Sequence, residues 1–578
     1  MAADTPEHPR AASRPSWRAY LPRPETELPA AERPTGAATR MGAATLASRG
    51  VGFVRVWMIT AVLGTTYLGN SFQATSSVSN VLFELLAAGA LSAVLVPTFV
   101  ELLDGGDQEE AERVASGLLG VAAVGLGLVA VIGMLLAPWL AAVLSNGAPA
   151  GPIADRQQAL STFFLLFFIP QVVFYAFGTV ATGVLYAQRR FVVPALAPVA
   201  NTVIVVVVLA IFHVVHPGTD LDLSLSEELL LAVGATLGVL AFCGVPVVAV
   251  LRSGFRLRAS IHRPDARLRR MLNLSTWAVL QHMGIGILLA ASIVMGNQVE
   301  GGVVAYQFAF VAFMAPYAIL AQPVHTTILP SLSIDAAAGD HDTFAARVRW
   351  AFESLSLLTL PVSAIMAALA LPAMIVITVG RSSDADLLAA ALASLAIGLL
   401  PYSAFLLFAR AFYALGDSRT PAIVALVTAC AGAAVMVVGA LAFHGAAVVA
   451  ALGIGNTVAY VLGAGVLGAV LSRRLGHRLV PRSVGKPLGL SIVMGLFLWG
   501  AERAIAPEGR LTTLVVLVGL VALAGAAYLG LLRLFARLPV ETAAPRPPVD
   551  AAGTPVGGAS RATTAETAEL DPDLAEEL

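Results

Sequence analysis

Apolar segments of membrane-spanning length follow one another along almost the whole chain. A helix needs about 20 mostly apolar residues to cross a bilayer, and fourteen segments meet this requirement. Their approximate bounds are 41–64, 70–101, 113–144, 158–187, 191–212, 228–251, 270–296, 302–333, 346–371, 386–414, 420–443, 446–472, 485–503 and 511–536. The pattern predicts an all-α polytopic membrane protein with about 14 transmembrane helices. The third segment contains Pro138, so we expect that helix to break near its outer end.

Arginines gather in alternate loops between these segments. They occur at 189–190, seven times between 252 and 270, and again between 473 and 482. The intervening loops hold only a few scattered arginines. Because Lys and Arg are enriched in cytoplasmic loops, this asymmetry predicts that both termini are cytoplasmic and that the number of spans is even.

The two ends of the chain differ from the rest. Residues 1–40 and 541–578 are rich in Pro and Ala and contain no apolar segment, so we expect disordered cytoplasmic tails. The first tail lacks the apolar stretch of about 7–15 residues that a signal peptide requires.

Charged residues make up only 12% of the 578 residues, about half the proportion in a soluble domain.

Features of the sequence recur six spans apart. The second segment ends in Val96-Pro97, and the eighth ends in Leu329-Pro330. Such parallel repeats are typical of transporters with a site between two halves. We therefore expect a first six-helix half, a basic linker, a second six-helix half and two further helices. Their bounds are 41–251, 252–269, 270–472 and 473–540.

Polar side chains interrupt the first two segments. They are Arg49 and Arg55 in the first, and Gln73, Ser77, Asn80 and Glu84 in the second. The spacing of four, three and four residues places the second set on one helix face. An ionisable group in hydrocarbon costs about 2.5–3.5 kcal/mol on the mildest scale, unless it faces a bundle interior or a watery cavity. The pattern therefore predicts a polar chamber inside the membrane.

Two specific interpretations of Arg55 follow, beside unrelated polar roles. In one, Arg55 and Glu84 form a buried ion pair that only fixes helix packing. In the other, the arginines bind an anionic headgroup such as pyrophosphate, because the planar guanidinium matches phosphate oxygens. Glu84 would then tune Arg55 or respond to protons or cations.

Weaker polar candidates lie in the second half. They are Gln281, His282, Gln307, Gln322 and His325. A lone polar residue in a span usually forms an interhelical hydrogen bond. Arg410 and Asp417 are seven residues apart at a helix end, which favours a structural clamp, with ion coupling by Asp417 as the alternative.

The sequence contains none of the following enzyme or ATPase motifs. The phosphate loop that ends in Gly-Lys-Ser/Thr is absent, and so are the GxSxG and HExxH motifs. Cys243 and Cys430 lie in apolar runs and predict neither a disulfide nor a metal site. We expect a carrier rather than an enzyme, with no cofactor and no nucleic-acid partner.

Several motifs resemble the MurJ (MviN) family. They are Ser48-Arg49 with Gly52-Phe53-Val54-Arg55, Asn80 with Gly89-Ala90-Leu91-Ser92 and Val96-Pro97, Phe191 to Pro198 with Asn201, and Arg410-Ala-Phe-Tyr-Ala with Asp417-Ser-Arg-Thr-Pro421. The resemblance runs from about residue 40 to the last span, and fourteen spans is the family's number. This family belongs to a superfamily with MATE drug exporters and polysaccharide flippases, and the pattern here looks like an actinobacterial branch.

The resemblance implies a flippase in the bacterial inner membrane. Members move lipid II, the undecaprenyl-pyrophosphate-linked peptidoglycan precursor, from the inner to the outer leaflet by alternating access. Their last two helices are thought to form a groove for the lipid tail. Membrane lipids, a monovalent cation and cell-wall synthesis proteins are the implied partners.

Individual residues can be carried over from the family pattern. Arg49 and Arg55 match essential cavity arginines, and Asn70, which stands where many members have Asp, joins the predicted substrate site. The chain also departs from the pattern. Phe83-Glu84 replaces an Arg-Arg pair, Ala88 replaces Glu, and Val311 falls about where many members have a functional Arg. Three alternatives remain open: a flippase for another polyprenyl-linked glycan, a MATE-like exporter, and a transport-dead scaffold in cell-wall synthesis.

Overall fold

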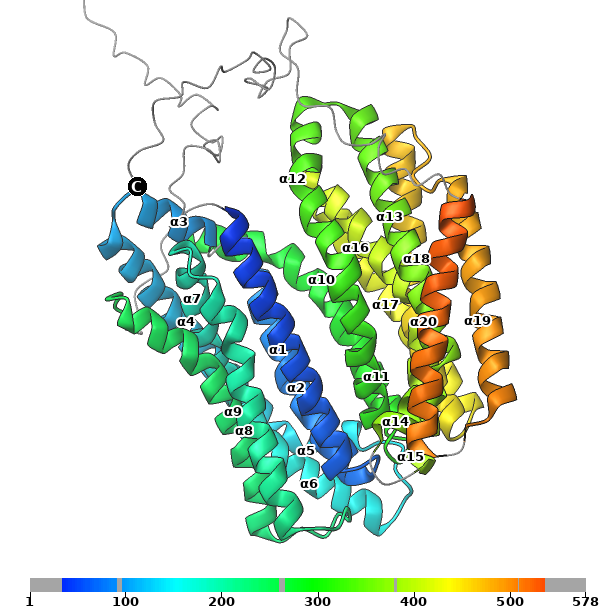
Figure 1. The fold of residues 1–578 in the computed structure, drawn as a ribbon. Helices are drawn as coiled ribbons and strands as arrows, with labels where there is room; N and C mark the ends of the chain where they lie inside the picture. The colour runs from blue at the N-terminus through cyan, green and yellow to red at the C-terminus, as the bar shows by residue number, and fades with distance from the viewer. Residues whose placement is uncertain (1–33, 91–95, 259–265, 379–381, 508, 536–578) are drawn as a thin grey trace, which may run out of the picture. The chain divides into compact units, whose positions relative to one another are not determined.

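The computed structural model describes residues 34–90, 96–258, 266–378, 382–507 and 509–535. Within these ranges the chain is helical and contains no strand, which confirms the predicted all-α class (Figure 1). The chain divides into two compact units, Met1–Ala524 and Gly525–Leu578. The second unit is described only over 525–535, where it continues a helix, so the following account concerns the first unit.

Nine helices make up the predicted first half. They are α1 (Pro34–Val62), α2 (Tyr67–Ala90), α3 (Val96–Asp104), α4 (Gln108–Leu135), α5 (Ala137–Leu144), α6 (Pro152–Phe168), α7 (Gln171–Ala187), α8 (Val192–Val215) and α9 (Leu225–Arg252). Since α1 begins at Pro34, the end of the predicted N-terminal tail belongs to this helix. The remainder of both predicted tails lies outside the described residues.

The rest of the described chain continues in the same manner. It contains α10 (Ala266–Gly296), α11 (Gly302–Pro316), the π-helical turn η5 (Tyr317–Ala321), α12 (Gln322–Ala338), α13 (His341–Ala368), α14 (Ala370–Ile377), α15 (Ser382–Ala396), α16 (Leu399–Ala414), α17 (Arg419–Ala442), α18 (Ala446–Leu475), the 3₁₀ turn η6 (Arg482–Val484), α19 (Gly485–Ile505) and α20 (Arg510–Phe535). The predicted linker overlaps the start of α10, and residues 259–265 are not described.

Several predicted spans are broken helices. The third is divided into α4 and α5, with Pro138 in the first turn of α5, as expected from the missing proline N–H. The fourth is interrupted at Pro170, between α6 and α7. The second was expected to run to residue 101; α2 is described to Ala90 and α3 from Val96, and residues 91–95 between them lie outside the described residues. The tenth is bent by 43° between α15 and α16.

The number of spans in the described residues is smaller than predicted. Ten helices are long and apolar enough to cross a membrane, and the bent pair α15–α16 makes eleven. The three remaining expected spans correspond to α1, α2 and α10. These helices carry the arginines and the polar stripe, or include residues whose placement is not described. Fourteen spans therefore stays a prediction.

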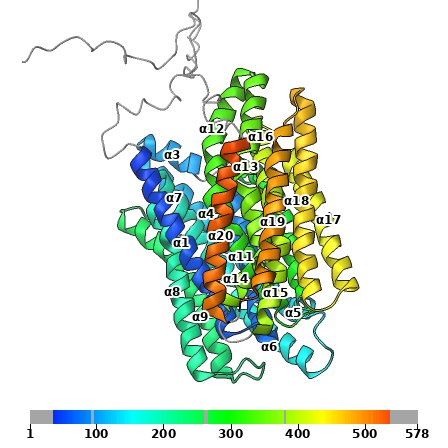
Figure 2. The ribbon, with the colours of Figure 1, turned by 45° about the vertical axis from the view of Figure 1, so that its right-hand side comes forward.

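Helix packing repeats between the two halves. In the first half, α1 packs on α8, α8 on α9, α7 on α9 and α2 on α6. In the second, the equivalent helices six spans later form the same pairs: α10 with α17, α17 with α18, α16 with α18 and α11 with α15. Figure 2 shows α17 and α18 side by side. The halves meet where α2 packs on α10 and α11, and where α1 packs on α11.

Candidate functional site

The two arginines of α1 lie at different depths in the protein. Arg49 is exposed, whereas Arg55 is half-buried. Counted from the end of the helix at Val62, they lie about 20 Å and about 10 Å along the axis. The first helix therefore carries two cations, one near its middle and one closer to its end at Val62.

Arg55 has donor capacity that the described residues leave unused. Its Nε is enclosed and has no hydrogen-bond partner among the described residues. The nearby group that interacts with it electrostatically is the hydroxyl of Tyr175 in α7, a neutral side chain. A guanidinium with an unpaired N–H in such a place can accept an anionic ligand as its partner.

Arg49 connects the two halves. Its Nη2 donates a hydrogen bond of 3.3 Å to Oε1 of Gln322, the first residue of α12. Gln322 was only a weak candidate from the sequence, since a lone intramembrane Gln usually serves packing. The structure brings it to one of the two arginines that the sequence singled out.

Arg410 of α16 joins this group through Tyr317 of η5. Tyr317 interacts with Arg410 and also, electrostatically, with Arg49. Nη1 of Arg410 is buried and has no hydrogen-bond partner among the described residues. Sequence reasoning missed this arrangement because it connected Arg410 with Asp417. The position of Arg410 inside an apolar segment of spanning length is the signal that would have assigned it to the chamber.

The other side of Tyr317 is anchored in the second half. Its hydroxyl lies 3.3 Å from Nδ1 of His325, and Nε2 of that ring lies 3.0 Å from the carbonyl oxygen of Ser403. His325 is completely buried. It is therefore a packing histidine that orients Tyr317, in agreement with the expected interhelical hydrogen bond.

The polar stripe of α2 is only partly described. Oε1 of Gln73 is buried without a partner in the described chain. Ser77 donates to the Gln73 carbonyl (2.7 Å) and accepts from Gln307 of α11 (3.5 Å). Asn80 is exposed. The side chain of Glu84 lies outside the described part, so its predicted contact with Arg55 stays a prediction.

Asn70 lies at the start of α2 and makes a different set of contacts. Its Nδ2 donates to Oδ1 of Asn297 (3.2 Å) and to the Val299 carbonyl (3.0 Å). Its Oδ1 accepts from the N–H groups of Val303 (3.1 Å) and Val304 (3.4 Å). All four contacts reach the corner between α10 and α11. In this conformation Asn70 therefore joins the halves, and its amide groups are already occupied.

Two further contacts close the same end of the protein. Gln157 of α6 donates to Asn297 (2.7 Å) and accepts from it (3.1 Å), and both side chains are buried. Gly301 has a φ of +72°, and a Cβ there would lie 2.3 Å from the Cβ of Thr65. Only glycine allows the two chain segments to approach so closely.

Asp417 forms a clamp, but with a different partner than expected. Helix α16 ends at Ala414, so the seven-residue spacing does not continue one helix face to Asp417. The carboxylate instead accepts from the N–H and hydroxyl of Thr420 (2.9 and 2.7 Å) and from Arg474 (2.7 Å). Partial burial would raise the pKa of Asp417, but these hydrogen bonds outweigh it and lower that pKa.

Other ligand types find little support. Within the described ranges, no group of three or more His, Cys, Asp or Glu side chains could hold a metal ion. His282 is half-buried, and the side chain of Gln281 is not described. Arginine, tyrosine and amide groups therefore supply the polar chemistry between the halves, a donor set suited to an anion.

Comparisons with known proteins agree with this arrangement. The sequence model of the family described as "Lipid II flippase MurJ" matches residues 59–537. The probable lipid II flippase MurJ of Rhizobium meliloti is 26% identical over 389 residues, which cover 67% of this chain and 71% of that protein. The lipid II flippase MurJ of Burkholderia cenocepacia is 24% identical, over 66% and 73% of the two chains.

Solved structures show the same fold. A lipid II flippase MurJ in an inward closed conformation has a TM-score of 0.67 at 15% identity, over 85% of this chain and 99% of that chain. An inward-facing multidrug resistance MATE transporter of the MOP superfamily has a TM-score of 0.57 at 14% identity, over 76% and 96%. The arrangement of helices is thus shared with both groups of transporter.

Proposed function

Because the chain belongs to the MurJ family of lipid II flippases, we propose that it moves lipid II from the inner to the outer leaflet of the bacterial inner membrane. The movement would follow alternating access between the two halves. Neither nucleotide nor cofactor is required in this proposal, and the protein is a transporter rather than an enzyme.

The observation that carries the proposal is the cationic group between the halves. Arg49 of α1 and Arg410 of α16 form this group, and Tyr317 interacts with both of them. Arg55 lies about 9 Å further along α1, beside Tyr175 of α7. Two of these arginines keep a buried nitrogen without a partner in the described chain. A pyrophosphate bound at Arg49 and Arg410 would supply an acceptor and neutralise positive charge, and Arg55 would offer a second contact along the path of the headgroup.

The closed end supports the alternating-access part of the proposal. Around Asn70 the halves are held by hydrogen bonds between buried amides, and by the close approach of Gly301 to Thr65. A lipid headgroup bound near Arg49 could leave toward the end of the protein that contains Asn70 only after these contacts separate. Hydrogen bonds of modest net strength suit a contact that must open repeatedly.

The remaining predicted residues take secondary roles. Gln73, Ser77 and Asn80 would line the path of the headgroup, and Glu84 would tune Arg55. Coupling to a monovalent cation through Asp417 is the weaker part of the proposal, because that carboxylate is already held by Thr420 and Arg474. Contacts with cell-wall synthesis proteins belong to the same set of expectations.

Complementation tests the proposal directly. We expect the full chain to restore growth when the resident MurJ of a bacterium is depleted, and variants without Arg49 or Arg55 to fail at equal membrane abundance. Failure of the wild-type chain, combined with rescue of a glycan-flippase mutant, would assign it to another polyprenyl-linked glycan. Rescue by the arginine variants would favour a scaffold role.

A further inference from the structure

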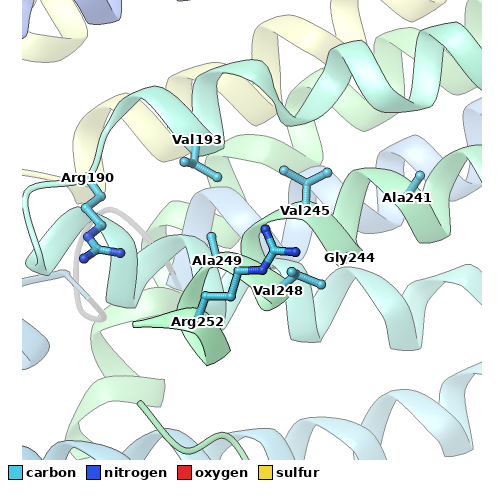
Figure 3. A pocket seen from close by; sticks show the side chains of 8 residues that line it. All are labelled: Arg190, Val193, Ala241, Gly244, Val245, Val248, Ala249 and Arg252. Carbon is cyan, nitrogen blue, oxygen red and sulfur yellow. The ribbon is translucent and has the colours of Figure 1, made fainter. Parts of the chain in front are cut away.

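A groove of about 580 Å³ lies where the turn before α8 meets the C-terminal part of α9 (Figure 3). The wall on α9 follows one helix face, with Gly244, Val248 and Arg252 at intervals of four residues. The opposite face of α9 is packed inside the protein, since Cys243 and Val250 are buried. The groove therefore opens away from the helix bundle.

The floor of the groove is apolar and open. Val245 and Val248 remain 36% and 45% exposed, although they lie on a helix of spanning length. A Cβ added at Gly244 would meet no atom within 4 Å. Exposed apolar side chains on a helix of spanning length are suited to contact with lipid hydrocarbon. The absence of a side chain at Gly244 leaves room for an acyl chain to pass.

One end of the groove is cationic. Arg190 and Arg252 are both exposed; Figure 3 shows Arg190 at the end away from Ala241 and the guanidinium of Arg252 beside Val248. Neither guanidinium has a side-chain partner in the described chain, and no acidic residue lines the groove. A planar guanidinium binds phosphate oxygens through two parallel N–H groups, and both side chains are exposed and long enough to turn toward one phosphodiester.

The cationic end is held in place by the fold. Nε2 of Gln188, in the turn that carries Arg190, donates a 3.2 Å hydrogen bond to the hydroxyl of Ser253, which follows Arg252. The same turn is closed by the Arg190 N–H, which donates to the Leu185 carbonyl at 2.8 Å. The backbones that carry the two arginines are thus tied together, so little entropy is lost when a ligand bridges them.

We propose that this groove binds one anionic glycerophospholipid of the cytoplasmic leaflet. Its phosphate would lie at Arg190 and Arg252, and one acyl chain would pass over Gly244 along α9. The arginine distribution assigns this end of α9 to the cytoplasmic side, where anionic lipids are abundant. The site shares no residue with the group around Arg49 and does not depend on the transport function.

Native mass spectrometry of the full chain in neutral detergent tests the proposal. Titration with dioleoyl phosphatidylglycerol should show one preferred bound lipid, and dioleoyl phosphatidylcholine should bind more weakly. The double variant R190Q/R252Q should bind phosphatidylglycerol about twenty-five-fold more weakly, since each arginine near a headgroup contributes about fivefold. Gly244→Leu should also reduce binding although it keeps both arginines.

Arg189→Gln is the matched control, because it removes one charge from the same turn but lies outside the groove. It should retain the wild-type affinity, and the unfolding temperature of every variant shows whether the fold is intact. Equal phosphatidylglycerol binding by the wild type and the double variant would overturn the proposal. The proposal would also be overturned if undecaprenyl pyrophosphate bound in this groove and phosphatidylglycerol did not.

Discussion

Asn70 donates a hydrogen bond of 3.2 Å to Asn297, and through it α2 of the first half holds the corner that precedes α11 of the second. Asn70 is completely buried and Asn297 is 1% exposed. Gln157 adds a third buried amide to the pair. The two halves are therefore joined at this end by polar groups, which must all find new partners when the halves separate.

Asn70→Ala should weaken this contact. It would leave the N–H groups of Val303 and Val304 without their acceptor, and a buried unsatisfied group costs roughly 1–3 kcal/mol. We expect a lower unfolding temperature of the purified protein and faster hydrogen exchange at the α10–α11 corner. Ser71→Ala is the control, since the Ser71 hydroxyl is buried but donates only within its own helix. Equal effects of both substitutions would contradict the assignment.

Gln322→Ala should affect transport far less than Arg49→Gln. The contact between the two side chains is a hydrogen bond from an exposed arginine to a neutral amide, so its loss contributes little to stability. The charge of Arg49 is what a pyrophosphate requires. In a lipid II flipping assay we expect a loss of more than about tenfold for Arg49→Gln, and less than about threefold for Gln322→Ala.

The control for this pair is Arg113→Gln, which removes a positive charge that is paired with Glu110 on the exposed part of α4. It should leave the flipping rate unchanged. If Gln322→Ala were as damaging as Arg49→Gln, the contact between the halves rather than the charge would explain the role of Arg49.

Asp417 should make stability depend on pH. Its pKa is lowered in the folded protein, so its contribution is present above the unfolded value of about 3.9 and is lost as the pH falls through the folded pKa. Because Arg474 is 45% exposed, we expect a contribution of roughly 1 kcal/mol. Between pH 5 and 3 the unfolding temperature should fall more for the wild type than for Asp417→Asn.

The same variant tests ion coupling. A carboxylate held by Thr420 and Arg474 serves the loop before α17, so Asp417→Asn should retain any dependence of flipping on sodium or protons. Loss of that dependence, with the unfolding temperature unchanged, would instead assign the coupling site to Asp417.

Hydrophobic periodicity predicted the helices well because it depends on local composition. It could not predict that Asn70 faces Asn297 across 227 residues, since such contacts follow from tertiary packing. The pairing of Arg410 with Asp417 was wrong for a local reason. It assumed a continuous helix, whereas α16 ends at Ala414 and Gly416 adopts a φ of +77°.

Both tails should be cytoplasmic. The arginine clusters in alternate loops predict this topology, and the tails themselves lie outside the described residues. Fusions of a cytoplasmically active reporter to either end should be active, and fusions of alkaline phosphatase should not. Alkaline phosphatase activity at one end only would mean an odd number of spans.

Arg55→Lys should impair transport, because a point charge does not replace the two parallel N–H groups of a guanidinium. We expect a loss of at least about tenfold in flipping, and an almost complete loss for Arg55→Ala. Both variants should still insert into the membrane, since removal of an intramembrane charge relieves an insertion cost. Membrane abundance, measured alongside, separates loss of transport from loss of protein.

The double variant R55A/E84Q distinguishes the two interpretations of Arg55. If Arg55 served only to neutralise Glu84, the double variant would remove both charges and leave no unpaired charge buried. Transport should then be restored. If Arg55 binds the headgroup, the double variant should fold and remain inactive, because the ligand has lost its anchor. Tyr175, the group that the structure places beside Arg55, is a neutral side chain, so an anionic headgroup can still pair with the guanidinium. We therefore expect a folded, inactive protein, and flipping at near-normal rates would end the headgroup-binding hypothesis.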